Sequence, residues 1–224
     1  MSRTLDYLLI IFIGAGLIVS SWLRLVPYDL VETLGFVTGA ACVYLVVRED
    51  VVNFPVGIAN DIFFFFLFFR ARLFGDSALQ IVYLALGLHG WYLWLYGGRN
   101  RTTLQITHAN RTTLLWLAVI TIIATACLTL ILWAVRGALP LLDAFTTVLS
   151  LAAQYMLNKK YFENWFVWIA ADAIYIYVYL SRNLSLTALL YLAFLVLCIA
   201  GVWSWWRIMK ASSDVTMSRN QLLT

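Results

Sequence analysis

Residues 163–179 read ENWFVWIAADAIYIYVY, an apolar stretch with a single carboxylate, Asp172, near its centre. Five side chains in this stretch are spaced three or four residues apart: Trp165, Trp168, Asp172, Tyr175 and Tyr179. On an α-helix this spacing places them on one face. Core packing would explain an aromatic face, but indole and phenol groups need polar partners in a dry interior. We therefore expect a polar cavity that suits an organic cation with flat rings.

The composition is that of a membrane protein. Of 224 residues, 63% are hydrophobic and only 12% charged, against about 25% charged in soluble domains. The sequence contains eight apolar segments, and the length of each is close to the roughly 20 residues that a helix needs to cross a bilayer. These segments lie near 6–23, 31–47, 53–70, 77–96, 114–135, 139–157, 164–181 and 184–207. The sequence predicts an all-α integral membrane protein with eight transmembrane helices, the first retained rather than cleaved as a signal peptide.

Several functional classes are disfavoured by the residues that are present. The three cysteines lie in apolar runs without metal-ligand spacing, so we expect no metal and no cofactor. There is no GxSxG, HExxH or Walker A motif, which argues against an enzyme. The net charge of +4 reflects basic loops rather than binding of nucleic acid. Ten of the fifteen Lys and Arg residues fall on one side of the eight predicted spans, which predicts cytoplasmic termini.

The chain contains an internal repeat. A gapless shift of 111 residues superposes Asn53 on Asn164, Asp61 on Asp172, and Trp94 on Trp205. Each repeat is a unit of three helices, and a single linking helix restores the parallel orientation of the second copy. The predicted parts are an N-terminal helix (1–30), the first repeat (31–97), a loop and linker helix (98–138), the second repeat (139–208) and a polar tail (209–224), which we expect to be disordered from Ala211 onward.

The predicted plan is a SWEET-like 3+1+3 bundle with one extra N-terminal helix. Two parallel three-helix repeats joined by a linker helix are the architecture of SWEET sugar carriers. In repeat transporters of this kind the substrate site lies near the midplane, between the halves. We therefore expect a ligand site formed by both repeats.

Asp61 and Asp172 occupy the middle of predicted spans, where each carboxylate costs roughly 2.5–3.5 kcal/mol. Three interpretations remain open at this point: a site for a cationic ligand, a proton or sodium coupling site, and structural hydrogen bonding. Amides that could face the same interior are Asn60, Gln80 and Gln154, and Trp94 adds a further indole. We expect His89 to be an interior histidine with satisfied hydrogen bonds rather than a proton shuttle.

Residues 142–180, LDAFTTVLSLAAQYMLNKKYFENWFVWIAADAIYIYVYL, resemble the second half of the Pnu-type vitamin transporter family. Residues 57–94, GIANDIFFFFLFFRARLFGDSALQIVYLALGLHGWYLW, resemble its first half. The resemblance covers residues 31–207, and its most specific motif is ENWxxW followed by Asn or Asp. Asp172 stands where some members carry Asn, and Asp61 where an apolar residue occurs.

The resemblance implies a SWEET-like carrier of a vitamin precursor in the bacterial inner membrane. It implies facilitated uptake of nicotinamide riboside, sustained by a cytoplasmic kinase, and an oligomer such as a trimer. Thiamine, also a cation, is the alternative ligand; an ion-coupled transporter and a non-transporting subunit are rivals of other classes. The substrate-binding residues that we expect are Trp165, Trp168, Asp172, Tyr175, Gln154, Asn60, Asp61, Gln80 and Trp94.

Overall fold

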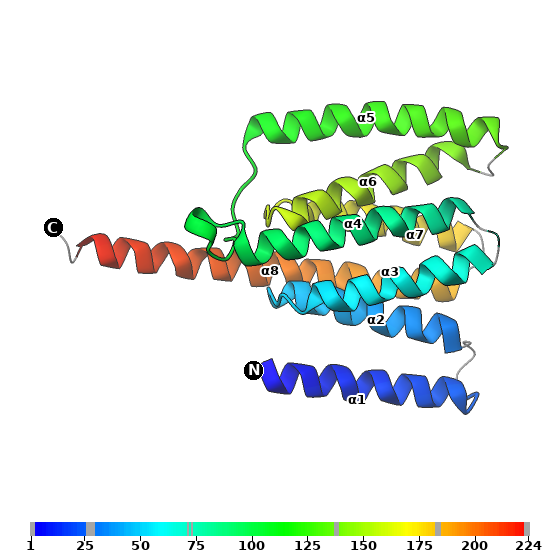
Figure 1. Cartoon of the computed structure of the whole chain (residues 1–224), viewed down its shortest axis with the longest axis horizontal. Coiled ribbons are helices and arrows are strands. Elements are labelled where there is room, and N and C mark those ends of the chain that lie inside the picture. The colour runs from blue at the N-terminus through cyan, green and yellow to red at the C-terminus, as the bar shows by residue number, and fades with distance from the viewer. Residues whose placement is uncertain are drawn as a thin grey trace. The chain divides into compact units, whose positions relative to one another are not determined.

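The computed structural model describes residues 3–25, 30–70, 72, 74–136, 139–181 and 185–221. Within these residues the chain forms eight α-helices and a short 3-10 turn, η1 (Arg99–Arg101) (Figure 1). The helices are α1 (Arg3–Trp22), α2 (Leu30–Val47), α3 (Asn53–Arg70), α4 (Phe74–Tyr96), α5 (Arg111–Ala134), α6 (Pro140–Asn158), α7 (Asn164–Ser181) and α8 (Ser185–Gln221). The β-structure of the described residues is limited to one isolated bridge, Thr107 to Tyr161. The expected all-α class is therefore confirmed.

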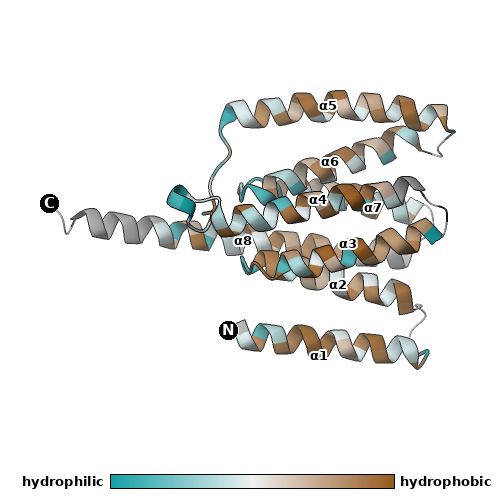
Figure 2. Ribbon diagram, in the orientation of Figure 1, coloured by the Kyte–Doolittle hydropathy of each residue, from teal (hydrophilic) through white to brown (hydrophobic). Residues whose placement is uncertain are grey.

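Four of the helices have the length and hydropathy to cross a bilayer. They are Thr4–Trp22, Ser77–Tyr96, Arg111–Ala134 and Tyr191–Ser212, and Thr33–Val47 is a shorter apolar helix. Figure 2 shows α5 as hydrophobic along most of its length, whereas the segment around η1 is hydrophilic. These helices make the chain a multi-pass membrane protein.

The chain forms two compact units, which we describe separately. The first comprises residues 1–46 and 50–88, and the second comprises residues 47–49 and 89–224. Helix α4 contributes to both, because the division falls between Leu88 and His89. The segment Val47–Glu49, which consists of the last residue of α2 and the two residues after it, belongs to the second unit.

In the first unit, two reciprocal hydrogen bonds attach α1 to the end of α2 and the turn that follows. The Tyr7 hydroxyl donates to Asp50 Oδ2 at 2.6 Å, and the Tyr44 hydroxyl donates to Asp6 Oδ1 at 2.9 Å. Both carboxylates are buried, at 3% exposure each. Because a buried anion requires hydrogen-bond donors, these two tyrosines fix α1 against the end of α2 and the turn after it.

In the second unit, successive helices pack against each other: α5 on α6, α6 on α7, and α7 on α8. The segment between α4 and α5 lies along the α6–α7 turn. The Thr107 amide donates to the Lys160 carbonyl at 3.1 Å, and the Phe162 amide donates to the Thr107 carbonyl at 2.9 Å. This pairing fixes the turn that precedes α7.

Helices α3 and α7 begin in the same way. Each has 18 residues, and their first residues, Asn53 and Asn164, are 111 positions apart. Asn53 Nδ2 donates to the Asp50 carbonyl and Asn164 Nδ2 to the Tyr161 carbonyl, both at 2.7 Å. Both asparagines are almost fully buried, so each side chain anchors its helix to the preceding turn.

One sequence-based expectation about the tail is wrong. Helix α8 continues to Gln221, whereas we expected disorder from Ala211 onward. No Gly or Pro follows Gly201 to end the helix. Extending an existing helix adds one hydrogen bond per residue without a new nucleation cost, so the polar segment remains helical.

Candidate functional site

The predicted face of α7 is the buried face of the helix. Trp165 is 1% exposed and Asp172 is 5% exposed. Trp168, Tyr175 and Tyr179 are half-buried. The opposite face is exposed through residues that include Phe166, Ala170, Ala173 and Tyr177. The spacing of three and four residues therefore identified the buried side of this helix correctly.

Three tryptophans form a layer beside the start of α7. The rings of Trp165 and Trp205 meet edge to face at 5.3 Å between centroids, and those of Trp94 and Trp205 lie 6.1 Å apart. Gly201 permits this approach, because a Cβ there would lie 2.5 Å from the Trp165 ring. We refer to Trp94, Trp165 and Trp205 as the tryptophan layer.

The indole N–H groups of this layer differ in their partners. Trp94 Nε1 donates to the Leu157 carbonyl at 3.2 Å. Trp165 Nε1 is buried and has no hydrogen-bond partner among the described residues. The Trp165 N–H is therefore a buried donor without a partner among these residues, which is an unfavourable state.

Three tyrosines form a second layer toward the other end of α7. Tyr191 of α8 lies 4.6 Å from Tyr175 and 5.2 Å from Tyr179, measured between ring centroids. Tyr175 and Tyr179 stack at 6.2 Å. Tyr179 therefore packs within the unit, although its place near the helix end also fitted an interfacial belt. Tyr175, Tyr179 and Tyr191 are called the tyrosine layer below.

Asp172 lies between the two layers along the helix. It follows Trp165 by seven residues, about 10 Å along the helix axis, and precedes Tyr175 by three. Its Oδ2 atom is 3.4 Å from the Sγ atom of Cys198 on α8, so the thiol donates a hydrogen bond to the carboxylate. A negative charge flanked by aromatic faces provides a suitable environment for a flat cation.

Gln154 of α6 is half-buried and donates from Nε2 to Asn158 Oδ1 at 3.1 Å. This contact, within one helix, uses one of the two donor hydrogens of its amide. The side-chain oxygen and a second hydrogen of Gln154 therefore retain the capacity to bind hydroxyl groups.

The other three predicted site residues belong to the first unit. Asn60 donates from Nδ2 to Thr38 Oγ1, so its amide also holds α3 against α2. Asp61 is half-buried and lies close enough to Cys42 for an electrostatic interaction. Gln80 is half-buried on α4. The structure thus brings together Trp94, Trp165, Asp172 and Tyr175 in one unit, and describes Asn60, Asp61 and Gln80 in the other.

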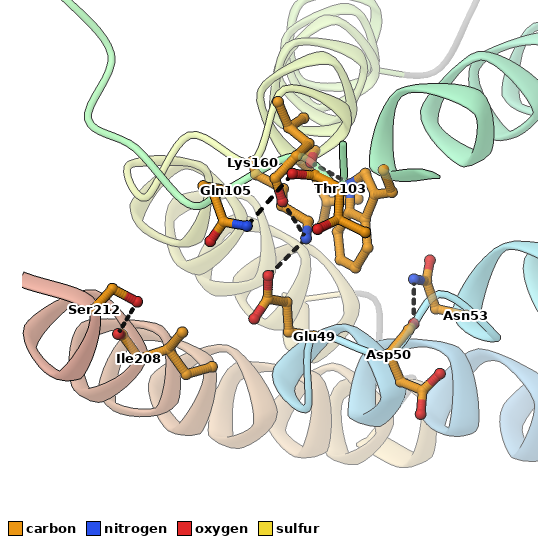
Figure 3. Close-up of polar contacts among 11 residues, drawn as sticks. Glu49, Asp50, Asn53, Thr103, Gln105, Lys160, Ile208 and Ser212 are labelled. Atoms are coloured by element: carbon orange, nitrogen blue, oxygen red, sulfur yellow. Dashed lines mark hydrogen bonds and ion pairs between the residues drawn. The ribbon is translucent and has the colours of Figure 1, made fainter. Parts of the chain in front are cut away.

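A buried lysine, Lys160, lies next to the tryptophan layer, and Figure 3 shows it beside Glu49. Lys160 Nζ donates to Glu49 Oε1 at 2.6 Å and to the Leu104 carbonyl at 2.8 Å, and it lies 4.3 Å from the centroid of the Trp94 ring. Burial lowers the pKa of Lys160 below its usual value, although its hydrogen bond to Glu49 and the charge of Glu49 oppose this shift. This ammonium connects the α2–α3 turn, the α4–α5 segment and the tryptophan layer.

Glu163, the residue just before α7, also binds the segment between α4 and α5. Its Oε1 is 2.7 Å from His108 Nδ1, and its Oε2 accepts from the Ala109 amide at 2.9 Å. Burial alone would raise the pKa of Glu163, but the hydrogen bonds from Ala109 and His108 outweigh it and lower the pKa. The ENW motif therefore also has a structural role, since Glu163 and Asn164 brace the turn.

Sequence reasoning underestimated several of these residues. The sequence places Cys198 in an apolar run without metal-ligand spacing, and only the fold reveals its contact with Asp172. The pairing of Glu49 with Lys160 was not expected, although the 111-residue shift relates the two positions. His89 is exposed on α4, so the expectation of an interior histidine is wrong. Among the described residues no group of His, Cys, Asp and Glu side chains is arranged to hold a metal ion.

These observations define a multi-pass helical membrane protein with a buried carboxylate between two aromatic layers. Residues 29–207 match the family model described as nicotinamide mononucleotide transporter, and the chain belongs to this family. It is therefore a membrane transporter and not an enzyme, as the sequence predicted.

Individual transporters are similar to this chain in sequence over most of its length. The nicotinamide riboside transporter PnuC of Escherichia coli K12 is 25% identical over 86% of this chain and 88% of its own length. The riboflavin/roseoflavin transporter RibM of Streptomyces davaonensis is 24% identical over 78% of this chain and 84% of its own. A crystal structure of the vitamin B3 transporter PnuC shares the fold, with a TM-score of 0.69, 21% identity, and coverage of 91% of this chain and 90% of that one.

Proposed function

We propose that this chain carries nicotinamide riboside across the bacterial inner membrane. The observation that supports this ligand best is the buried Asp172 carboxylate between the tryptophan and tyrosine layers. Relatives over most of the chain's length are nicotinamide riboside transporters. Nicotinamide riboside carries a positive, planar pyridinium ring, which matches both the charge and the shape of these surroundings.

The two parts of the ligand would meet different groups. The pyridinium ring would lie against Trp165 or Trp168, where a desolvated cation over an indole face gains about 2 kcal/mol. Asp172 would neutralise its charge. The unpartnered Trp165 N–H and the amide of Gln154 would bind carboxamide or ribose oxygens, since both groups retain hydrogen-bonding capacity.

Thiamine is the second candidate, because its thiazolium ring also combines a positive charge with a flat surface. Asp172 favours both cations over an uncharged ligand such as riboflavin, which a relative at 24% identity transports. The charge of Asp172 therefore favours nicotinamide riboside and thiamine over riboflavin, but it does not distinguish the two cations from each other.

The proposed mechanism is facilitation through a SWEET-like 3+1+3 bundle. The equal spacing of the starts of α3 and α7, and of α4 and α8, supports two three-helix repeats linked by α5. In this mechanism the repeats rock around a site near the midplane, to which Asn60, Asp61 and Gln80 of the first repeat also contribute. A cytoplasmic kinase would retain the substrate by phosphorylating it.

The proposed orientation places both termini in the cytoplasm, in accord with the excess of Lys and Arg on that side. All eight helices would cross the membrane in this arrangement, and the protein would assemble as a homo-oligomer such as a trimer. Cysteine labelling from either side of intact cells tests the orientation, and crosslinking in the membrane tests the assembly.

Uptake into liposomes containing the purified protein tests the function. Labelled nicotinamide riboside, thiamine and riboflavin are compared, each with and without a proton or sodium gradient. We expect saturable uptake of nicotinamide riboside that does not require a gradient. A faster saturable uptake of thiamine would favour the second candidate, absence of uptake for all three would refute a vitamin carrier, and a strict need for a gradient would refute facilitation.

A further inference from the structure

The carboxylate of Asp172 has one built-in hydrogen-bond donor, the thiol of Cys198. Both side chains are buried, Asp172 at 5% and Cys198 at 4% exposure. The Cys198 Sγ atom lies 3.4 Å from Asp172 Oδ2, a hydrogen-bonding distance for sulfur. The sole hydrogen bond of the Asp172 side chain, among the described residues, is therefore made at Oδ2. The other oxygen, Oδ1, retains its capacity to interact with a bound group.

The position of Cys198 makes this contact specific to the second repeat. The 111-residue shift relates Cys198 to Gly87, which has no side chain to offer. A Cβ on Gly87 would lie 3.3 Å from Ile58 Cγ1, so a larger residue would crowd α3. Asp61, the counterpart of Asp172, has no hydrogen bond among the described residues. The two related carboxylates thus differ in whether a neighbouring side chain holds them.

The Cys42 thiol in the first unit has another partner. Cys42 Sγ donates to the Asn53 carbonyl at 3.4 Å, so it supports the start of α3. Although Cys42 is close to Asp61, its hydrogen bond goes to the backbone. Among the described residues, Cys42 and Cys198 therefore donate hydrogen bonds of equal length, and of these two thiols Cys198 is the one that bonds to a carboxylate.

We infer that Cys198 is a positioning residue of the ligand site, which holds Asp172 Oδ2 and so directs Oδ1 to the cationic ring of the ligand. This inference rests on the proposed function. The thiol suits the role because it is a weak donor. It fixes the rotamer of Asp172 but withdraws less negative charge from the carboxylate than a hydroxyl or ammonium group would. Tyr191 of the tyrosine layer also lies close enough to Asp172 to interact with its charge.

The test compares two ligands that differ in charge, nicotinamide riboside and its uncharged reduced form. Cys198→Ala removes the donor, Cys198→Ser restores one, and Cys42→Ala is the matched control. We expect Cys198→Ala to weaken binding of nicotinamide riboside about fivefold, which corresponds to the loss of one hydrogen bond. Binding of the reduced form should change less than twofold. Cys198→Ser should recover most of the loss, and Cys42→Ala should leave both affinities as in the wild type.

An infrared measurement tests the hydrogen bond directly. We expect the S–H stretching band of Cys198 to shift when Asp172 is changed to Asn in the protein without ligand, and Cys42→Ala to leave that shift intact. Equal weakening of both ligands by Cys198→Ala, no weakening at all, or an S–H band insensitive to Asp172→Asn would overturn the inference. If the wild type binds neither ligand, the proposed function fails, whereas the infrared shift still decides whether the thiol holds Asp172.

Discussion

Glu49 and Lys160 are 111 residues apart, the same shift that superposes the two halves of the sequence, and they bind each other directly. Their side chains meet at 2.6 Å, and both backbones adopt the left-handed conformation, with φ of 54° and 50°. A contact between equivalent positions brings identical residues together in a perfect duplication. Two glutamates or two lysines would repel at this distance, whereas the opposite charges that are present form an ion pair.

Removing one charge of this pair should destabilise the protein. Glu49→Gln leaves Lys160 buried, at 4% exposure, with the Leu104 carbonyl and the Trp94 ring as its remaining partners. We expect a loss of about 3 kcal/mol, at the low end of the range for breaking a buried ion pair. Thermal unfolding in detergent measures it as a lower midpoint temperature than that of the wild type.

The same pair offers an internal control by exchange of its charges. Glu49→Lys combined with Lys160→Glu restores opposite charges at two positions with the same backbone conformation. We expect the double variant to be more stable than either single variant, because each single change places like charges together. A double variant no more stable than the singles would show that the contact contributes nothing through charge.

The stability of the α4–α5 segment should depend on pH through Glu163. Its pKa is lowered in the folded protein by the hydrogen bonds from Ala109 and His108, against the opposing effect of burial. A group with a depressed folded pKa stabilises the protein fully above its unfolded value and loses that contribution as pH falls through the folded value. We therefore expect wild-type stability to fall below about pH 4.5.

Glu163→Gln should show a weaker dependence in this pH range, because the substituted side chain has no proton to bind. The midpoint of thermal unfolding, followed from pH 7 to pH 3.5, compares the two proteins. Parallel curves would mean that Glu163 does not contribute to acid sensitivity.

Gly201 should tolerate no added methyl group, because a Cβ there would lie 2.5 Å from the Trp165 ring. Gly201→Ala must displace Trp165 from the tryptophan layer, and overpacking of this kind costs about 1–3 kcal/mol. We expect lower transport activity, together with a change in tryptophan fluorescence. Gly16→Ala is the matched control, since a Cβ on Gly16 would meet nothing within 4 Å and alanine favours a helix.

Asp172 should discriminate ligands by charge. Asp172→Asn keeps the size of the side chain but removes the anion from between the two aromatic layers. We expect binding of nicotinamide riboside to weaken about tenfold, with a smaller effect on its uncharged reduced form. Titration calorimetry with the two ligands measures the difference, and Asp143→Asn, at an exposed position in the first turn of α6, is the control. Equal loss for both ligands would indicate a structural carboxylate.

The sequence was informative where periodicity and composition determine structure. The bounds predicted for the helices at 53–70 and 164–181 are those observed, since polar turns and Asn residues mark both starts. The buried face of α7 also followed from spacing alone. The lengths of the apolar segments and the internal repeat are properties of the linear sequence, so both can be recognised from the order of residues.

The side-chain contacts around the candidate site could not be predicted from the sequence pattern. Periodicity assigns Cys198 to a face of α8, but the rotation of α8 against α7 decides whether its thiol reaches Asp172. Likewise, the path of the α4–α5 segment places Leu104 at Lys160 and Ala109 at Glu163. Such contacts join residues distant in sequence, and they depend on side-chain packing that a linear pattern does not encode.

The anchored asparagine at the start of α7 has a mechanical consequence. Asn164 bonds to the Tyr161 carbonyl, Thr107 pairs with the same turn, and Glu163 holds the segment beside it. A turn secured from three directions cannot act as a hinge, because hinge residues must change φ and ψ freely. We therefore expect helices α6 and α7 to move together as one body, and any bending that admits a substrate to take place outside this turn.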